Sequence, residues 1–157
     1  MGAVVQKNEL VSIRARLKRE GKRVVFTNGC FDLLHLGHVE YLQKAKNLGD
    51  VLVVGINDDA SVRRLKGAPR PITPENDRVS IIAALAAVDY TCLFSEDTPL
   101  ELITALRPDV LVKGADWAVD AVVGKKLVEG FGGTVRTIEF VPNRSTSGII
   151  AKIRESQ

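Results

Sequence analysis

The sequence Thr27-Asn28-Gly29-Cys30-Phe31-Asp32-Leu33-Leu34-His35-Leu36-Gly37-His38 stands between an apolar run, Val24-Val25-Phe26, and a helical pattern. It therefore lies at a predicted junction between a strand and a helix. Its two glycines let backbone N–H groups come close to a phosphate, and the helix that follows adds the positive end of its dipole. Both histidines of the protein stand here, where imidazoles can donate hydrogen bonds to phosphoryl oxygens. We predict a triphosphate site and the transfer of a nucleotidyl group.

Two other interpretations of the histidines explain the pattern less well. A single histidine would be taken as an ordinary loop residue, but His-x-Gly-His between a strand and a helix is a more specific signal. Histidines three residues apart could also share a zinc ion. No second pair of ligands follows at metal spacing, so we expect no metal-binding side chains.

The composition is that of a globular domain that binds small anions. The chain has 157 residues, with 45% hydrophobic and 26% charged residues, and this size suits one domain. The formal net charge of +3 is too small to indicate a nucleic-acid-binding protein, and no dense run of Lys and Arg supports one. A mild positive excess suits nucleotides and sugar phosphates.

The cysteines and the apolar segments indicate a cytoplasmic protein. Cys30 and Cys92 lie at or in strand-like segments and match no metal spacing, so we expect reduced thiols. The N-terminus lacks the apolar region of a signal peptide. The longest apolar runs are far too short to span a bilayer.

Apolar periodicity predicts an alternation of strands and helices along the chain. Strands are predicted at residues 24–27, 51–56, 90–94, 110–113 and 134–140. Helices are predicted at residues 8–19, 38–48, 59–66, 74–87, 99–107, 122–131 and 147–154. The expected fold is a single α/β domain with a Rossmann-like, doubly wound sheet of about five parallel strands. Residues 1–22 would form an N-terminal helix and residues 23–157 the catalytic core.

Two helix starts are predicted from capping patterns. Thr73 precedes Pro74, which is typical of an N-cap followed by proline at the first helical position. The segment Thr98-Pro99-Leu100-Glu101 has the spacing of a capping box. In doubly wound sheets, ligands bind beyond the carboxyl ends of the strands, where the connections diverge to opposite faces. The loop at residues 27–38 would lie at such a point.

Several motifs together resemble a known family. The histidine motif resembles that of the nucleotidyltransferase superfamily, which includes cytidylyltransferases, pantothenate synthetases and class I tRNA synthetases. More narrowly, nearly the whole chain resembles the adenylyltransferase domain of ADP-heptose synthases. The matching segments, in order, are Thr27-Asn28-Gly29-Cys30-Phe31-Asp32, Leu65-Lys66-Gly67 with Arg70-Pro71-Ile72, Glu75-Asn76-Asp77-Arg78, Val112-Lys113-Gly114-Ala115-Asp116-Trp117, and Ser145-Thr146-Ser147 before Ile149-Ile150.

The resemblance implies roles for individual residues. His35 and His38 would stabilise the triphosphate during in-line attack at the α-phosphorus, with Lys44 and Lys66 as cationic catalytic partners of the phosphates. The implied nucleotide- and phosphate-binding residues are Thr27, Asn28, Gly29, Cys30, Phe31, Gly37, Lys113, Gly114, Asp116, Ser145, Thr146 and Ser147. Asp32, Arg78 and Trp117 are further candidates for substrate binding.

Some of these residues have an alternative structural role. Lys44 lies on an amphipathic helix and is explained about as well as a solvated surface lysine. Lys66 could be an exposed loop lysine, although its Gly- and Pro-rich loop could close over ATP. Arg78 could pair with Asp77 or Glu75 on its own helix.

Three further candidates also have structural explanations. The Ser145-Thr146-Ser147 segment could be an N-cap, which is compatible with phosphate binding. Trp117 could pack against a loop rather than stack on a ligand. Asp32 could orient a loop through hydrogen bonds from backbone N–H groups, and we do not expect it to act as a general base.

The resemblance implies an adenylyltransferase that joins ATP and D-glycero-β-D-manno-heptose 1-phosphate into ADP-heptose, for lipopolysaccharide core synthesis, and releases pyrophosphate. Mg²⁺ would be held mainly by the ATP phosphates, since no carboxylate cage is evident. In this family the domain is often fused to a sugar kinase, which this chain is too short to include. The chain is therefore either a stand-alone enzyme, for which a separate heptose kinase would be a functional partner, or an excised domain. A homodimer is compatible with this interpretation.

Two other functions stay open. One is a cytidylyltransferase that acts on glycerol 3-phosphate or a related alcohol phosphate. Related cytidylyltransferases carry an arginine and Gly-Ile before the Ser-Thr pair, whereas Pro142-Asn143-Arg144 stands here, which weakens the case for cytidine. The other is a nucleotide-binding regulatory module without turnover, against which the intact histidines argue.

Overall fold

The central strands form from β-branched apolar runs that are buried on both faces, as β3 (Val51–Asn57) is along its whole length. The computed structural model describes residues 1–115, 118–139, 142 and 144–156. All strand pairs in the sheet are parallel, in the order β1-β4-β3-β2-β5-β6. The other strands are β1 (Ala3–Val4), β2 (Val24–Gly29), β4 (Tyr90–Phe94), β5 (Val110–Gly114) and β6 (Thr134–Ile138).

The predicted doubly wound parallel sheet is confirmed, with six strands in the described part of the chain instead of about five. The additional strand, β1, has two residues and pairs with β4 at the edge of the sheet. A strand of this length is too short to produce a periodic pattern, which is why the sequence did not predict it.

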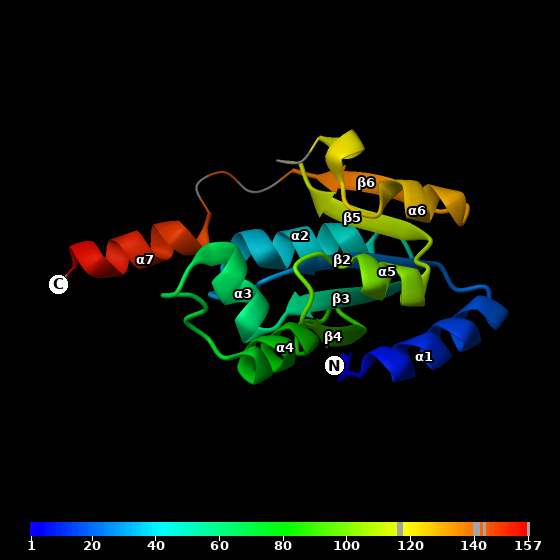
Figure 1. Cartoon of the computed structure of the whole chain (residues 1–157), viewed down its shortest axis with the longest axis horizontal. Coiled ribbons are helices and arrows are strands. Elements are labelled where there is room, and N and C mark those ends of the chain that lie inside the picture. Colours follow the sequence, from blue (N-terminus) through cyan, green and yellow to red (C-terminus); the bar gives the residue numbers. More distant parts are fainter. Residues whose placement is uncertain (116–117, 140–141, 143, 157) are drawn as a thin grey trace.

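The helices cover both faces of the sheet (Figure 1). They are α1 (Lys7–Arg19), α2 (Leu36–Lys46), α3 (Asp59–Lys66), α4 (Glu75–Ala83), α5 (Leu100–Leu106), α6 (Lys125–Gly130) and α7 (Thr146–Glu155), with a short 3₁₀ helix at Val119–Ala121. One core cluster joins α1, α5 and α6 to the sheet, and the other joins α2 and α4 to the opposite face. Successive residues of β2 alternate between them, because Phe26 belongs to the first cluster and Val25 to the second.

The order of the strands fixes where the chain changes direction. From β2 the chain runs outward through β3 to β4, with α2 and α4 on one face. It then returns through α5 to β5, on the other side of β2, with α5 and α6 on the opposite face. The connections therefore diverge at the carboxyl end of β2, where such sheets bind ligands.

Both capping predictions are wrong in detail. The N-cap of α4 is Pro74, not Thr73, and the N-cap of α5 is Pro99, without a capping hydrogen bond from a side chain. Thr73 is held elsewhere, because its backbone N–H donates to Asp32 Oδ1 at 2.8 Å. Helix α4 also ends at Ala83 rather than at residue 87.

Helix α7 is the least integrated element. None of its residues is buried, and in Figure 1 it extends away from the sheet. Its first turn is nevertheless attached to the body, since Thr146 Oγ1 donates to the Leu33 carbonyl at 3.1 Å. The N-terminus of α7 thus lies beside the loop that follows β2.

Arg78, a candidate for substrate binding, is a structural residue instead. It is 1% exposed and lies on α4. Its guanidinium donates to the Thr73 carbonyl at 2.9 Å, to the Cys30 carbonyl at 2.6 Å and to Asp59 Oδ1 at 2.8 Å. It thereby ties α4 to the loop after β2 and to the start of α3, rather than to its helical neighbours.

Replacing Arg78 should therefore destabilise the fold. In Arg78→Met the carboxylate of Asp59 and two carbonyls lose their donor, and we expect a loss of about 3–5 kcal/mol, the usual cost of breaking a buried ion pair. Urea unfolding would measure it. The matched control is Arg63→Met on the exposed side of α3, which should change the free energy of unfolding by less than about 0.5 kcal/mol. Equal stability of the two variants would contradict the structural role.

Candidate active site

A cavity of about 690 Å³ opens at the carboxyl ends of β2, β3 and β5. It is the place predicted from the change of direction at β2. Of the predicted nucleotide- and phosphate-binding residues, the cavity is lined by Asn28, Gly29, Cys30, Phe31, Lys113, Gly114, Thr146 and Ser147. Segments that are far apart in the sequence therefore meet around one space, as the motif pattern indicated.

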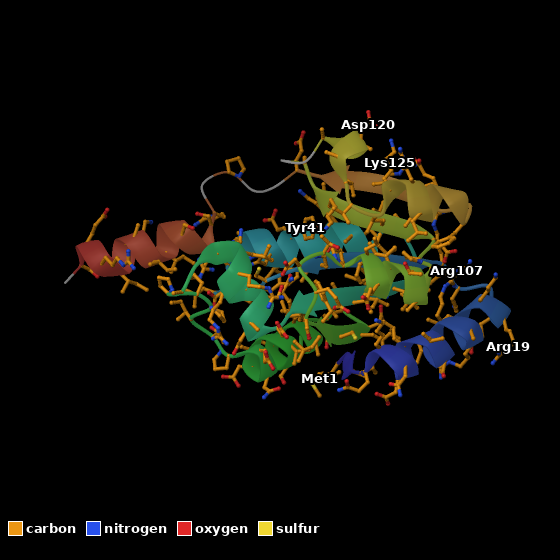
Figure 2. The ribbon with its side chains drawn as sticks, viewed as in Figure 1. Met1, Arg19, Tyr41, Arg107, Asp120 and Lys125 are labelled. Atoms are coloured by element: carbon orange, nitrogen blue, oxygen red, sulfur yellow. The ribbon has the colours of Figure 1, made fainter. Side chains whose placement is uncertain are left out.

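The floor of the cavity is fixed by hydrogen bonds from β2 to its neighbours. Thr27 is fully buried behind the floor, where it donates to the Val112 carbonyl at 3.0 Å and accepts from the Tyr41 hydroxyl at 2.8 Å. Tyr41 lies on α2, in the middle of the molecule in Figure 2. In front of it, Lys113 Nζ donates to Asn28 Oδ1. Thr27 thus supports the floor, while Asn28 and Lys113 face the cavity.

The two histidines stand at the start of α2. His35 is the N-cap residue, and its ring stacks on that of His38 with 3.9 Å between the ring centroids. Gly37 is buried between them, where a Cβ would come within 2.9 Å of His35 Nδ1 and 3.3 Å of Arg144 Cβ. The glycine of the His-x-Gly-His motif is therefore required by the close approach of these side chains.

Burial disfavours the protonated form of both imidazoles in the free protein. It lowers the pKa of His38 to about 4, with a smaller contribution from His35 beside it. Burial and the Arg144 guanidinium lower the pKa of His35. Nδ1 of each ring is buried and has no hydrogen-bond partner among the described residues. A polyphosphate bound in the cavity beside His38 would supply a negative charge that favours protonation.

Phe31 adds a strained element next to His38. Its φ of 46° lies in the left-handed region, which is uncommon for a residue with a side chain. Its ring packs 5.3 Å from the ring of His38 and fills the space beside Gly29, where a Cβ would lie 3.1 Å away. Phe31 thus contributes to the burial of His38.

The thiol of Cys30 lines the cavity, in surroundings that disfavour the thiolate. Burial raises its pKa, although Lys66, Arg78 and Arg70 oppose the rise. Cys92 is buried in the core, where burial raises its pKa to about 11. Both cysteines are free thiols, as predicted.

The N-terminus of α7 forms part of the cavity wall. Ser145 is its N-cap and accepts from the Gly148 N–H at 3.0 Å, so the predicted capping role is confirmed. The next two residues, Thr146 and Ser147, line the cavity. Arg144, which the sequence did not single out, lies beside His35. Its position would have been found only by knowing that α7 returns to the loop after β2.

Asp32 organises the loop at residues 67–73. It is buried and accepts from Arg70 Nε at 2.6 Å, from the Ile72 N–H at 2.9 Å and from the Thr73 N–H at 2.8 Å. Burial tends to raise the pKa of its carboxyl, but these hydrogen bonds outweigh burial and hold the pKa below its usual value. The loop-orienting role is confirmed, and Asp32 stays ionised at neutral pH.

The two predicted catalytic lysines differ in position. Lys66 is the last residue of α3 and lines the cavity. Lys44 is exposed on α2 and does not line it, because Tyr41, Leu42 and Ala45 are the residues that α2 buries against the sheet. Of the two, only Lys66 is in place to meet a phosphate. Asp116 and Trp117 fall outside the described residues.

The described residues offer little to bind a metal ion directly. They contain no group of three or more His, Cys, Asp and Glu side chains that could hold one. Asp32, the buried carboxylate of the cavity, is already occupied by its three donors. Within the described part of the chain, no helix is long and apolar enough to cross a membrane.

Comparisons with known proteins agree with this geometry. The bifunctional protein HldE of Syntrophotalea carbinolica is 62% identical over 136 residues, which are 87% of this chain and 28% of that protein. HldE of Geobacter sulfurreducens is 59% identical over 144 residues, or 92% of this chain and 29% of that protein. The chain thus spans less than a third of the length of these relatives.

Solved structures extend the comparison. A lipopolysaccharide core biosynthesis protein from Thermoplasma volcanium is 35% identical, with a TM-score of 0.64, over 77% of this chain and 98% of that one. Pantoate-beta-alanine ligase from Francisella tularensis shares the fold, with a TM-score of 0.65 at 19% identity, over 94% of this chain and 69% of that one. The cytidylyltransferase-like family matches residues 26–153. The chain belongs to the cytidylyltransferase-like family of nucleotidyltransferases.

Proposed function

We propose that this protein transfers the AMP group of ATP to D-glycero-β-D-manno-heptose 1-phosphate, forming ADP-heptose for the lipopolysaccharide core. The observation that carries the proposal is the pair of stacked histidines at the start of α2, of which His38 lines a cavity at the divergence point of the sheet. The sugar is proposed from the relatives, which are named HldE and lipopolysaccharide core biosynthesis protein.

The proposed reaction needs no covalent intermediate. An oxygen of the sugar 1-phosphate attacks the α-phosphorus of ATP, the new P–O bond forms, and the bond to the β-phosphate breaks to release pyrophosphate. His38 and the N-terminus of α7 would hold the phosphates in place and stabilise the charge that develops on them. Mg²⁺ would enter with ATP, held by phosphate and water, since the described residues supply no carboxylate cage.

Part of the cavity lining next to β5 is apolar, which supports a nucleoside there. Val122 and Val123, which follow β5, give the cavity an apolar surface that suits the faces of a nucleobase. Lys113 and Gly114, at the end of β5, line the same cavity as His38. We propose that the adenosine of ATP lies on this side of β2.

Pyrophosphate release tests the function. We expect it with ATP and heptose 1-phosphate, with kcat/KM for ATP more than about tenfold above that for CTP, because wrongly paired buried polar groups are costly. The assay covers the four nucleoside triphosphates, each with heptose 1-phosphate and with glycerol 3-phosphate. Turnover of CTP with glycerol 3-phosphate would favour a cytidylyltransferase. ATP binding without any pyrophosphate release would favour a regulatory module.

The proposed substrates imply partners. The acceptor is a sugar 1-phosphate, so a sugar kinase must act before this protein, and we propose a heptose kinase in the cytoplasm. We also propose a second copy of the chain as a partner, which sedimentation of the purified protein would test. A protein that stays monomeric at every concentration measured would contradict the proposed self-association.

His38 should act on the transition state. We predict that His38→Ala lowers kcat by about 10² or more and changes KM for ATP much less, since the imidazole meets charge that develops during transfer. Steady-state kinetics would measure both constants. His35→Ala should also be damaging, with its effect divided between binding and rate. A His38→Ala variant with nearly unchanged kcat would remove the basis of the mechanism.

The depressed pKa of His38 should make stability depend on pH. Because its folded pKa of about 4 lies below the unfolded value of about 6.5, the unfolded state binds more protons between these values. Stability should rise with pH through this window and level off above it. Urea midpoints from pH 4.5 to 7 should therefore change more steeply in the wild type than in His38→Gln. Parallel curves for the two proteins would contradict the assignment.

Lys66 should act when the loop at residues 67–71 closes over ATP. The loop is attached at its far end, where Arg70 binds Asp32, while Lys66 itself is exposed at the rim. We predict that Lys66→Ala weakens ATP binding or slows transfer with almost no change in Tm, because an exposed lysine contributes little to folding. Limited proteolysis with and without ATP and Mg²⁺ would follow closure. Equal cleavage in both conditions, with normal kinetics of the variant, would exclude the role.

A further inference from the structure

Asn57 is a buried amide that faces the cavity and has no part in holding the phosphates. It is the last residue of β3, is 3% exposed, and lines the cavity next to the end of β2. The pairing of Gly29 with Ile56 places Asn57 beside the loop that follows β2. Buried polar side chains are costly unless their hydrogen bonds are made, so this amide calls for an explanation.

A chain of hydrogen bonds fixes which way the Asn57 amide points. The hydroxyl of Ser61 donates to the Glu96 carbonyl at 3.2 Å, so its single proton is used there. Ser61 Oγ can then only accept, and it accepts from Asn57 Nδ2 at 2.9 Å. Ser61 is itself held on the first turn of α3, because its N–H donates to Asp58 Oδ1 at 2.7 Å. The amide nitrogen therefore faces Ser61, and the amide oxygen faces away from it.

The amide oxygen is left as an acceptor for a ligand. Among the described residues, none donates a hydrogen bond to Asn57 Oδ1. The oxygen is also not one of the buried side-chain atoms without a partner in that part of the chain, so it is not enclosed by protein. Since the side chain lines the cavity, its oxygen is the part that a bound molecule can reach. Because the relay through Ser61 locks the orientation, the acceptor is in position before the ligand arrives.

The neighbours of Asn57 suit hydroxyl groups. The loop after β4 packs beside it, since the Asp58 N–H donates to the Phe94 carbonyl at 2.9 Å. That loop brings Asp97 and Thr98 to the same cavity, and Arg64 Nε donates to Asp97 Oδ1 at 2.7 Å, which offsets its negative charge. An amide oxygen, an ion-paired carboxylate and a hydroxyl form a set of acceptors on the β3–β4 side, across β2 from the apolar surface after β5.

We propose that Asn57 determines specificity for the acceptor, with its Oδ1 accepting a hydrogen bond from one hydroxyl of a polyhydroxylated sugar phosphate. Ser61 is the positioning residue that holds the amide in this orientation. The proposal rests on the proposed function, since it assigns the acceptor sugar to the β3–β4 side of the same cavity. A site built to bind a hydroxyl strongly rejects an analogue that lacks it, because the acceptor in the protein is then left unpaired.

Kinetics of single variants give the first test. Asn57→Ala and Ser61→Ala should each raise KM for heptose 1-phosphate by about tenfold or more, while KM for ATP changes by less than about twofold. The control is Thr91→Val, which removes a fully buried hydroxyl that bonds the Val79 carbonyl away from the cavity. It should leave both KM values unchanged. A rise in KM for ATP that equals the rise for the sugar would overturn the proposal.

Acceptors that lack one hydroxyl each give the decisive test. For the wild type, one deoxy analogue of heptose 1-phosphate should lower kcat/KM by about as much as the Asn57→Ala substitution lowers it for the full sugar. For Asn57→Ala, the same analogue should lower kcat/KM almost no further. Independent, additive losses for every analogue would overturn the role of Asn57. If Asn57→Ala does not fold, the same comparison with Ser61→Ala decides. If the wild type turns over no sugar 1-phosphate, the proposed function is refuted. That result is distinct from additive losses, which can be measured only in an active enzyme.

Discussion

The hydrogen bonding of β2 to both of its neighbours is the constraint on which the site depends. Val25 pairs with Leu52 of β3 on one side and with Val110 of β5 on the other. This register sets the carboxyl ends of the three strands side by side, so that residues 28–29, 57 and 113–114 meet around one cavity. A slip of one residue would turn every side chain to the opposite face and disperse these groups. Thr27 reinforces the register, since it bonds to β5 through the Val112 carbonyl.

Local patterns were sufficient to predict most of this arrangement. The apolar runs predicted five of the strands, and the histidine motif predicted the junction between β2 and α2 at the edge of the cavity, because both signals lie within a dozen residues. Helix α3 was predicted with its observed bounds for the same reason.

Apart from the short strand β1, the main differences arise at residues whose partners lie outside the local sequence pattern. Arg78 is drawn into the interior by Asp59 and two carbonyls, none of them on its own helix. Thr73 is not an N-cap because Asp32 holds its backbone. The acceptor at Asn57 depends on Ser61 and on Glu96, and Arg144 reaches His35 only through the return of the chain. The periodicity of apolar residues along the sequence carries no information about such contacts.

Because α7 is exposed, its helical structure depends in part on what binds at its N-terminus. A helix of ten residues that buries none of them has little to hold it together, because helices this short are marginal in water. Yet its N-terminus forms one wall of the cavity. A phosphate that binds there shifts the coil–helix equilibrium toward the helix. The observed binding free energy is then reduced by the free energy needed to order this segment. Apparent affinity for the nucleotide should then weaken on warming faster than the stability of the sheet does, as the tail melts before the body.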